Sequence, residues 1–365
     1  MRKLIEDILY EKRSDSYLTP LRTGLGILEG GYYVITDIRN FLYDKHIFKI
    51  HDVRCKVVSI GNVTLGGTGK TPVVIMTARM VQKAGYSVAV VSHGYKGGSR
   101  TPLVVSDGTD MCISPVESGD EPHIIARSLP GIPVVTGKDR YRAALLANER
   151  FKPQVIILDD GLQHRRLYRT VDVVTIDAEN PFGNEHLLPR GILRESPYVL
   201  KRVQAVIITR FREEFKRDKI KRFMEFYGCK APIFWSTHVP VGFRRPGSVT
   251  RLELETVRGR KVAVLSNIAR PDSFHHMLES LGVDIIAKHI MADHHRYKEE
   301  ELKKIEMNAR DAGADLLVMT AKDERNIPEH YNVELVEKLI LDIEAVLLGD
   351  EEKYLEIVCP YGKIN

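Results

Sequence analysis

The feature that most restricts the fold is a glycine-rich segment between two apolar stretches of different periodicity. Residues 55–60, CKVVSI, are a short apolar run typical of a buried strand, and GNVTLGGTGKT follows directly. The next stretch, VVIMTARMVQKAG, has apolar residues at the spacing of a helix. A strand, a glycine-rich turn and a helix in this order predict a phosphate-binding loop.

Residues of this loop have expected roles toward a nucleotide. Glycines let the backbone approach a phosphate without a Cβ in the way, and the helix N-terminus adds its positive end. Lys70 is expected to reach the β and γ oxygens, and the Thr71 hydroxyl to bind magnesium. Thr64 stands where the strict pattern has its first glycine, so the alternative is a glycine-rich turn that precedes Lys-Thr by chance. The expected nucleotide contacts are Thr64, Leu65, Gly66, Gly67, Thr68, Gly69, Lys70 and Thr71.

Two adjacent carboxylates end another apolar run. In VIILDDGLQHRR, Asp159 and Asp160 directly follow the apolar residues. A DG pair by itself is typical of a turn. Beside a phosphate-binding loop, a carboxylate at the tip of a buried strand is how nucleotide hydrolases and kinases hold magnesium, and we favour that interpretation.

Short apolar runs alternate with helical stretches along most of the chain. YSVAVVSHG, PVVTG, PQVIILDDG, VDVVTIDA and AVIITR indicate strands buried on both faces of a parallel sheet, and RKVAVLSNI, VDIIAKHIM and DLLVMTAKD form a second series. The expected fold class is α/β, with a P-loop NTPase-like three-layer domain and a second, smaller α/β domain. We place an N-terminal helical region at 1–48, the first domain at 49–235, the second at 236–340, and a C-terminal segment that can return to the first domain at 341–365.

Composition narrows the function. Lys and Arg number 54 against 49 Asp and Glu, and the resulting net charge of +5 mildly favours phosphates but is too small to indicate nucleic acid. The four cysteines lie far apart without a CxxC pair, so neither a zinc knuckle nor a disulfide framework is expected. The first twenty residues are charged throughout, so no signal peptide is expected.

A stripe of apolar residues lies near the N-terminus. Between Leu21 and Phe48 such residues recur every three or four positions, but charges interrupt the run, so it is not an ordinary membrane-spanning helix. Two interpretations remain open: the stripe packs on the protein's own core, which the pattern alone favours, or it lies in a membrane interface. The stripe consists of Leu25, Leu28, Tyr32, Ile35, Ile38 and Leu42.

Three further motifs carry side chains suited to act on an acceptor. SGDEP places Asp120 and Glu121 at a helix start, where they either cap the helix, accept a proton or bind a metal. MADHHRY has two adjacent histidines, which do not share one face and are therefore not expected to bind one zinc; we prefer one histidine paired with a distant carboxylate. The long loop from Asn180 to Pro197 carries Arg190 and Arg194, whose guanidinium groups can fork onto a phosphate of the acceptor.

Together these motifs resemble the tetraacyldisaccharide 4'-kinase family, the lipid A 4'-kinases. GNVTLGGTGKTP, SHGYKG, SGDEP, DDGLQHRRL and NPFGNEHLLPRGILRESP occur in the family's order and approximate spacing, between about Leu21 and Asp323. The resemblance implies transfer of the ATP γ-phosphate to the 4'-hydroxyl of a tetraacyl glucosamine disaccharide 1-phosphate, with ATP and Mg²⁺ as cofactors. It implies no nucleic acid and no obligatory protein partner. It also implies attachment to the cytoplasmic face of the bacterial inner membrane through the N-terminal helix, which makes the membrane interpretation of the stripe the favoured one.

The resemblance assigns roles to residues at matching positions. Asp120 matches the family's proposed catalytic aspartate, and His294 matches the histidine that forms a dyad with it. Arg140 resembles an arginine near the phosphates, and Tyr95 a residue close to the nucleotide. The expected catalytic residues are Asp120, His294, Lys70 and Arg140; the expected metal ligands are Thr71, Glu121, Asp159 and Asp160; the expected substrate contacts are Gln163, His164, Asn180, Arg190 and Glu195.

Three positions depart from the family pattern. His93, Asn267 and Ala321 stand where arginine, glycine and glutamate are common, all outside the magnesium and base positions. Two other functions compete with the lipid kinase. A P-loop kinase or NTPase acting on a soluble substrate would use the stripe as core. A nucleotide-gated metallochaperone would need a Cys or His cluster with ligand spacing, which the sequence lacks.

Overall fold

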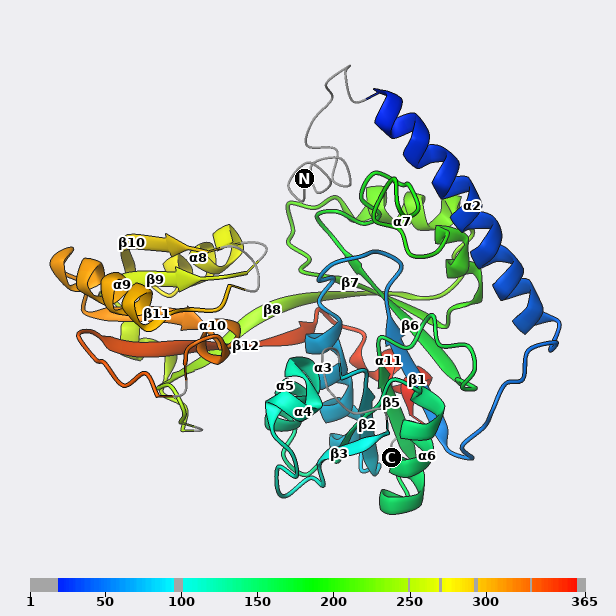
Figure 1. Ribbon diagram of the computed structural model, residues 1–365, viewed down its shortest axis with the longest axis horizontal. Coiled ribbons are helices and arrows are strands. Elements are labelled where there is room, and N and C mark those ends of the chain that lie inside the picture. The colour runs from blue at the N-terminus through cyan, green and yellow to red at the C-terminus, as the bar shows by residue number, and fades with distance from the viewer. Residues whose placement is uncertain are drawn as a thin grey trace. The chain divides into compact units, whose positions relative to one another are not determined.

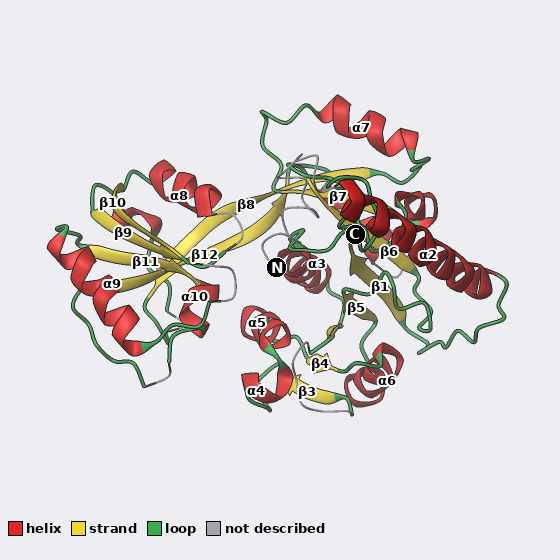
Figure 2. Ribbon diagram, turned by 45° about the horizontal axis from the view of Figure 1, so that its top comes forward, coloured by secondary structure: helices red, strands yellow, loops and turns green. Residues whose placement is uncertain are grey.

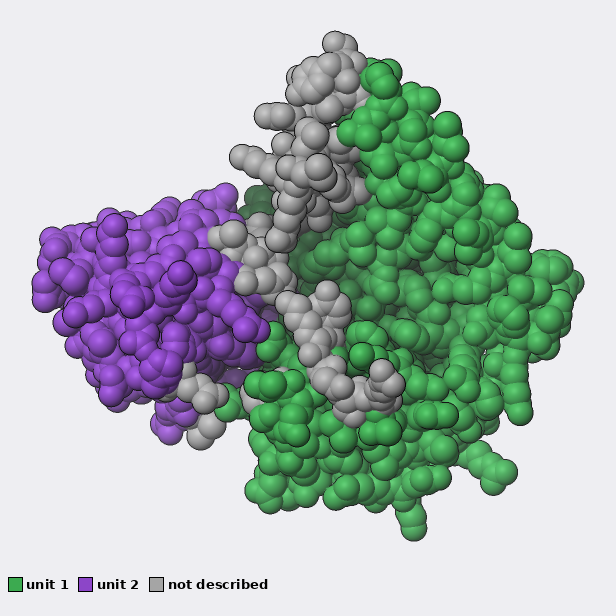
Figure 3. Space-filling view, in the orientation of Figure 1, with its two compact units in different colours: residues 1–237, 345–365 green, residues 238–344 purple. Residues whose placement is uncertain are grey.

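The chain folds into two compact units (Figure 1). The computed structural model describes residues 19–94, 101–248, 250–268, 271–291, 295–328 and 330–359. One unit comprises residues 1–237 and 345–365 and the other residues 238–344, coloured separately in Figure 3. The strands β8 (Ile233–Arg244) and β12 (Glu337–Leu347) carry the chain out of the first unit and back into it.

The first unit is built on a largely parallel sheet. Its strand order is β8-β7-β6-β1-β5-β2-β4-β3, so β1 lies between β5 and β6. The described pairs run parallel except β3 with β4, which is antiparallel. The strands not yet given are β1 (Lys56–Gly61), β2 (Val88–Ser92), β3 (Leu103–Ser106), β4 (Val134–Thr136), β5 (Val155–Asp159), β6 (Val171–Asp177) and β7 (Ala205–Thr209).

Helices cover both faces of this sheet, as Figure 2 shows. Val58 of β1 packs in one apolar cluster with Val74 of α3, whereas the preceding Val57 packs in another cluster with Ala143 of α6. Successive side chains of a strand point to opposite faces, so a strand buried throughout needs cover on both. The predicted three-layer α/β class is confirmed. The helices are α3 (Lys70–Lys83), α4 (Pro115–Ser118), α5 (Asp120–Ser128), α6 (Arg140–Phe151), α7 (Arg217–Phe226) and α11 (Glu351–Val358), with a 3₁₀ helix over Pro197–Arg202.

The second unit is a smaller α/β arrangement. Its strands follow the order β10-β9-β11-β12, and the described pairs are parallel. The apolar runs of the sequence predicted β9, β10 and β11 but not β8 or β12, whose mixture of apolar and polar residues conceals them. The elements are β9 (Lys261–Ser266), α8 (Pro271–Ser280), β10 (Asp284–Ile290), α9 (Glu299–Asp311), β11 (Leu316–Thr320), α10 (Ala321–Arg325) and a 3₁₀ helix over Leu254–Val257.

The helix α2 (Thr19–Asp44) lies on the surface of the first unit. None of its 26 residues is fully buried. Tyr32 of the apolar stripe packs against the core of the first unit, whereas other residues of the stripe lie at the surface, so packing on the core accounts for only part of the stripe. Ile35 and Ile38 of the stripe are 68% and 52% exposed. The side chains of Glu29 and Arg39 instead bond to the loop 180–197. Among the described residues, no helix has the length and apolar character needed to cross a membrane.

Candidate active site

The glycine-rich loop joins β1 to α3, and neighbouring segments fix its backbone. The Leu65 N–H donates to the Ile192 carbonyl at 2.6 Å. Thr64, at the position of the usual first glycine, is 3% exposed, and its carbonyl accepts from Asn62 Nδ2 at 2.7 Å. The loop therefore tolerates threonine at this position, since its course is held from both sides.

The glycines give the loop its shape and its open surface. Gly66 and Gly69 have φ angles of 100° and 77°, in the left-handed region that favours glycine. Gly69 immediately precedes α3, so the first N–H groups of that helix face the loop. A Cβ on Gly67 would find its nearest neighbour, Arg210 Nη2, only at 3.9 Å. Exposed backbone N–H groups at a helix start form a cradle for an anion.

Thr68 ties the loop to the ends of β6 and β7. Its Oγ1 lies 2.9 Å from Thr175 Oγ1, and its carbonyl accepts from the Thr209 hydroxyl at 2.8 Å. The residue is buried by these contacts. We therefore expect Thr68 to meet a bound phosphate through its backbone rather than its side chain.

Asp159, the last residue of β5, is a buried carboxylate with another carboxylate nearby. It is 2% exposed, and its Oδ2 accepts from the Ser92 hydroxyl at 2.8 Å. Burial and the nearby Glu121 carboxylate raise the pKa of Asp159 to about 6. The ionised form of Asp159 would therefore be stabilised by a cation bound beside it.

Asp160, by contrast, is paired with two cations. Lys70 Nζ lies 3.6 Å from its Oδ1, and Arg194 Nη1 donates to both of its oxygens at 2.9 and 3.1 Å. Burial acts to raise the pKa of Asp160, but Lys70 and Arg194 outweigh it and lower that pKa to about 2. Asn62 Oδ1 accepts from both Lys70 and Arg194, at 3.1 and 3.2 Å. Arg194, expected from the sequence to meet a phosphate of the acceptor, thus pairs with Asp160.

The donor set at this edge fits Mg²⁺. Within the part of the chain that the structure describes, no three His, Cys, Asp or Glu side chains are gathered to enclose a metal by themselves. Mg²⁺ does not need such a cage, because it is commonly held by one or two carboxylates, water and substrate phosphates. A divalent cation beside Asp159 would also relieve the repulsion from Glu121 that raises the pKa of Asp159.

Arg140, the first residue of α6, is buried beside two histidines. It is 2% exposed, and its Nη1 donates to the Gly137 carbonyl at 3.0 Å and to His93 Nδ1 at 2.5 Å. Burial, reinforced by the charge of Arg140, lowers the pKa of His93 and lowers that of His164 to about 4. Both imidazoles are therefore neutral near neutral pH. The His93 ring nitrogen thus helps to hold the Arg140 guanidinium in place.

Asp120 and Glu121 form the first turn of α5. Gly119, with φ of 82°, occupies the capping position, so Asp120 is the first helical residue and not the cap. The start of α5 lies at the end of β2, because a Cβ on Gly94 would come within 3.0 Å of the Ser118 carbonyl oxygen. Asp120 is exposed at this edge, where a carboxylate can accept a proton from a bound hydroxyl.

Two of the expected substrate contacts lie near other residues of this site. Gln163 donates from Nε2 to the Asn62 carbonyl at 3.1 Å, and His164 is close enough to Arg140 for that charge to lower its pKa. The expected residues Tyr95 and His294 lie outside the described residues, so their roles stay predictions.

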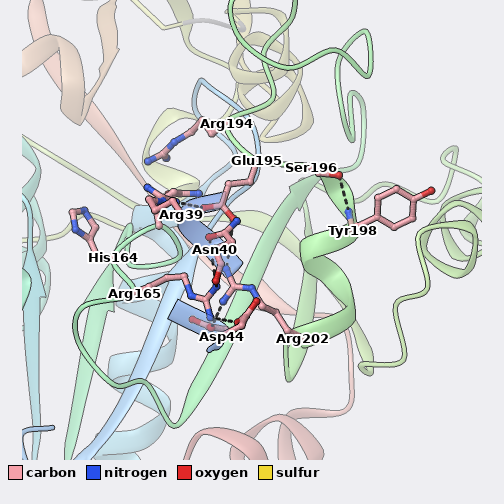
Figure 4. Close-up of polar contacts among 12 residues, drawn as sticks. Arg39, Asn40, Asp44, His164, Arg165, Arg194, Glu195, Ser196, Tyr198 and Arg202 are labelled. Carbon is pink, nitrogen blue, oxygen red and sulfur yellow. Dashed lines mark hydrogen bonds and ion pairs between the residues drawn. The ribbon is translucent and has the colours of Figure 1, made fainter. Parts of the chain in front are cut away.

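The other expected substrate contacts belong to the loop 180–197, which packs against α2. Glu195 is 2% exposed, with its carboxylate 3.3 Å from Arg39 and 3.5 Å from Arg202 (Figure 4). Arg190 lies 3.7 Å from Glu29 of α2, and Asn180 is half-buried. The Glu195 carboxylate therefore holds α2 and the loop together.

Several residues of this site were not predicted from the sequence. Asn62 links Lys70 to Arg194, and its signal is its place directly after the strand that precedes the loop. Arg39 and Arg202 surround Glu195 but come from segments far apart in the chain, so only the fold brings them together.

The fold and the site define a class: an α/β phosphotransferase or nucleotide hydrolase with a P-loop at the end of a central parallel strand and an acidic pair on the next strand. A family model narrows this class. The model of the tetraacyldisaccharide-1-P 4'-kinase family matches residues 21–360, and the chain belongs to that family of kinases. The resemblance seen in the motifs is thereby confirmed.

Individual relatives agree with the family model. The tetraacyldisaccharide 4'-kinase of Syntrophus aciditrophicus is 41% identical over 80% of this chain and 81% of that protein. The enzyme of the same name from Elusimicrobium minutum is 35% identical over 90% of this chain and 88% of its own. Among solved structures, LpxK from Aquifex aeolicus in complex with ATP aligns with a TM-score of 0.74 at 28% identity, covering 93% of this chain and 98% of that one.

Proposed function

We propose that the chain transfers the γ-phosphate of ATP to the 4'-hydroxyl of tetraacyldisaccharide 1-phosphate. One observation carries the proposal: Lys70 of the P-loop is paired with Asp160, next to the buried Asp159, at the sheet edge where Asp120 lies exposed. Phosphoryl transfer needs these components together, namely an anion cradle, a cation for the phosphate oxygens, oxygen ligands for a metal, and a base.

Each residue then has one task in the reaction. Lys70 stabilises the charge on the phosphoryl oxygens in the transition state. Asp120 accepts the proton of the 4'-hydroxyl while that oxygen forms its bond to phosphorus and the bond to the leaving β-phosphate oxygen breaks. His294 is proposed to partner Asp120, as the family resemblance implies. Arg140 is proposed to contact the phosphates.

The proposed cofactor besides ATP is Mg²⁺. When bound, it neutralises charge on the β- and γ-phosphate oxygens. Its protein ligands would come from the Thr71 hydroxyl and from the carboxylates of Glu121, Asp159 and Asp160. Their oxygen atoms are the donor type that Mg²⁺ prefers.

The outward face of α2 supports attachment to a membrane surface. Leu28, Ile35 and Ile38 are 59%, 68% and 52% exposed, whereas Glu29 and Arg39 bond to the unit beneath. A helix arranged in this way can bury its apolar side chains at the boundary of headgroups and acyl chains. An acceptor with four acyl chains will hardly leave a bilayer, so we propose that the enzyme works at the cytoplasmic face of the bacterial inner membrane.

The activity is tested by transfer from γ-labelled ATP to tetraacyldisaccharide 1-phosphate in mixed micelles. We expect label in the lipid, and a loss of about 10²- to 10⁴-fold in kcat for Asp120→Ala, because a positioned base contributes about that much. The matched control is Asp218→Ala, which removes an exposed aspartate from the first turn of α7. ATP hydrolysis without lipid labelling would contradict the proposal and favour a soluble substrate.

Membrane attachment has its own test. Ile35→Asp should weaken binding to vesicles of phosphatidylethanolamine and phosphatidylglycerol by about tenfold or more, since an apolar side chain is withdrawn and a negative charge added. Thr23→Asp adds the same charge to an exposed position of α2 and serves as the control. Equal vesicle binding by wild type and Ile35→Asp would rule out this face as the attachment surface.

A further inference from the structure

Arg210 is a charged residue at the glycine-rich loop for which the proposed reaction gives no role. It directly follows β7 and has φ of 54°, a left-handed conformation that is uncommon for residues other than glycine. Its Nη1 lies 2.6 Å from Asp177 Oδ2, at the end of β6. Its Nη2 would be 3.9 Å from a Cβ on Gly67, so the guanidinium group lies beside the open surface of the loop.

The strand order indicates which part of a bound nucleotide would lie near Arg210. β5, with the acidic pair, lies on one side of β1, and β6 and β7 lie on the other. Lys70 and the acidic pair mark where the γ-phosphate is held in the proposed reaction. With the γ-phosphate there, a triphosphate that runs along the loop away from β5 would bring the nucleoside to the side of β6 and β7, where Arg210 is.

Other contacts keep Arg210 in place. The preceding Thr209 donates its hydroxyl to the Thr68 carbonyl at 2.8 Å, which fixes the end of β7 against the loop. Asp177 is 5% exposed and orients the guanidinium through Nη1. The Arg210 side chain remains 25% exposed, so part of it is open to a ligand.

We propose that Arg210 stacks its guanidinium plane on the adenine ring of ATP, with Asp177 as the residue that positions it. This proposal rests on one part of the proposed function, namely that the chain binds ATP. A planar guanidinium stacks well on an aromatic ring because it is flat, weakly hydrated and positively charged. Every base offers such a face, so Arg210 contributes affinity for the nucleoside and little discrimination between adenine and guanine.

A phosphate contact is the competing role for an arginine near a P-loop. The structure favours the base, because Asp177 already neutralises part of the Arg210 charge and because Arg210 follows β7, two strands from β1. The two roles make different predictions for a ligand that has the phosphates and lacks the nucleoside. Inorganic tripolyphosphate is such a ligand.

The experiment measures binding of ATP, ADP and tripolyphosphate with Mg²⁺ to the full chain by calorimetry. Arg210→Ala should weaken ATP and ADP binding about 5- to 30-fold and leave tripolyphosphate within about twofold. Arg212→Ala is the matched control, since Arg212 follows the same strand, is 44% exposed and pairs with Glu179. Arg210→Phe, which keeps a flat surface without the charge, should retain most of the affinity for ATP.

Each other result has a definite meaning. An equal loss for ATP and tripolyphosphate would overturn stacking in favour of a phosphate contact, and no loss for either would overturn any nucleotide contact. Thermal unfolding of each variant shows whether it folds. If Arg210→Ala does not fold, binding of ATP and tripolyphosphate by Arg210→Phe tests the stacking proposal instead. The proposed function fails separately, by absence of lipid labelling in the wild type, whatever Arg210 does.

Discussion

The carboxyl ends of β5 and β7 lie on opposite sides of the glycine-rich loop and carry opposite charges. Both strands are followed by a residue in left-handed conformation, Asp160 with φ of 53° and Arg210 with φ of 54°. Asp160 pairs with Lys70 and Arg194, whereas Arg210 pairs with Asp177. The same backbone geometry thus supplies an acidic side suited to a metal and the γ-phosphate, and a basic side suited to the nucleoside. The comparison predicts that the two sides govern different kinetic constants.

The largest effect is expected from Lys70→Ala on the acidic side. We expect kcat to fall about 10³-fold or more, because Lys70 acts on charge that develops in the transition state. Arg210→Ala should instead raise KM for ATP and leave kcat within about threefold. Initial rates at saturating lipid and varied ATP separate the two constants. Lys83→Ala, at the other end of α3, is the control, and a similar loss of kcat in Lys70→Ala and Arg210→Ala would break the distinction.

Substitution of two glycines, Gly61 and Gly67, should separate an effect on stability from an effect on ATP binding. A Cβ on Gly61 would come within 2.5 Å of Leu162 Cβ and 2.9 Å of its backbone nitrogen, so Gly61→Ala should reduce the free energy of unfolding by about 2–4 kcal/mol. Gly67→Ala meets no such clash and should change stability by less than about 0.5 kcal/mol. Its methyl group, however, occupies the space above the loop, so ATP affinity should fall about tenfold or more. Urea unfolding and ATP titration measure the two effects. Normal ATP binding by Gly67→Ala would show that the phosphates do not lie over Gly67.

The acidic side could be predicted from the sequence, and the basic side could not. Asp159 and Asp160 end an apolar run in a chain that also has a P-loop, and that combination has one common chemical use. Arg210 also follows an apolar run, but its importance depends on β7 lying two strands from β1. Strand order is set by how helices cross over the sheet, and the local pattern of residues does not encode it.

The N-terminal helix is a second case in which the sequence predicted an element but not its surroundings. Periodicity predicted a helix between Leu21 and Phe48, and α2 spans Thr19–Asp44. It did not reveal which face turns inward, because an apolar face suits a protein core and a lipid interface equally well. The deciding contacts are polar: Glu29 Oε1 accepts from the Leu187 N–H at 2.8 Å. The parallel strands of the first unit were predicted more fully because their continuous apolar runs have fewer explanations.

A smaller effect, on stability, should distinguish the two aspartates. The pKa of Asp159 is raised in the folded chain to about 6 from a usual value of 3.8. Its contribution to stability is therefore fully present below about pH 4 and is lost as the pH rises through about 6. Asp159→Asn removes that loss and should make the nucleotide-free protein about 1–3 kcal/mol more stable than the wild type at about pH 8, with no difference at about pH 4.

Asp160 should show the opposite sign. Its pKa is lowered to about 2 in the folded chain, so its contribution is present above about pH 4 and is lost as the pH falls toward 2. Asp160→Asn should therefore destabilise the protein at about pH 8. Thermal unfolding of both variants at the two pH values tests the pair. Equal shifts of the same sign would show that the two carboxylates share one environment.

The smallest effect is expected from Asp177→Asn on the basic side. The amide keeps the shape of the side chain and can still accept from Arg210 Nη1, but it loses the charge that orients the guanidinium. A partly exposed ion pair is worth about 0.2–1 kcal/mol, so KM for ATP should rise about two- to fivefold with kcat unchanged. In an Arg210→Ala background the same substitution should add nothing, because its effect passes through Arg210. Additive losses in that double-mutant cycle would mean that Asp177 acts on the nucleotide independently, and the basic side would then contain two separate contacts and not one positioned arginine.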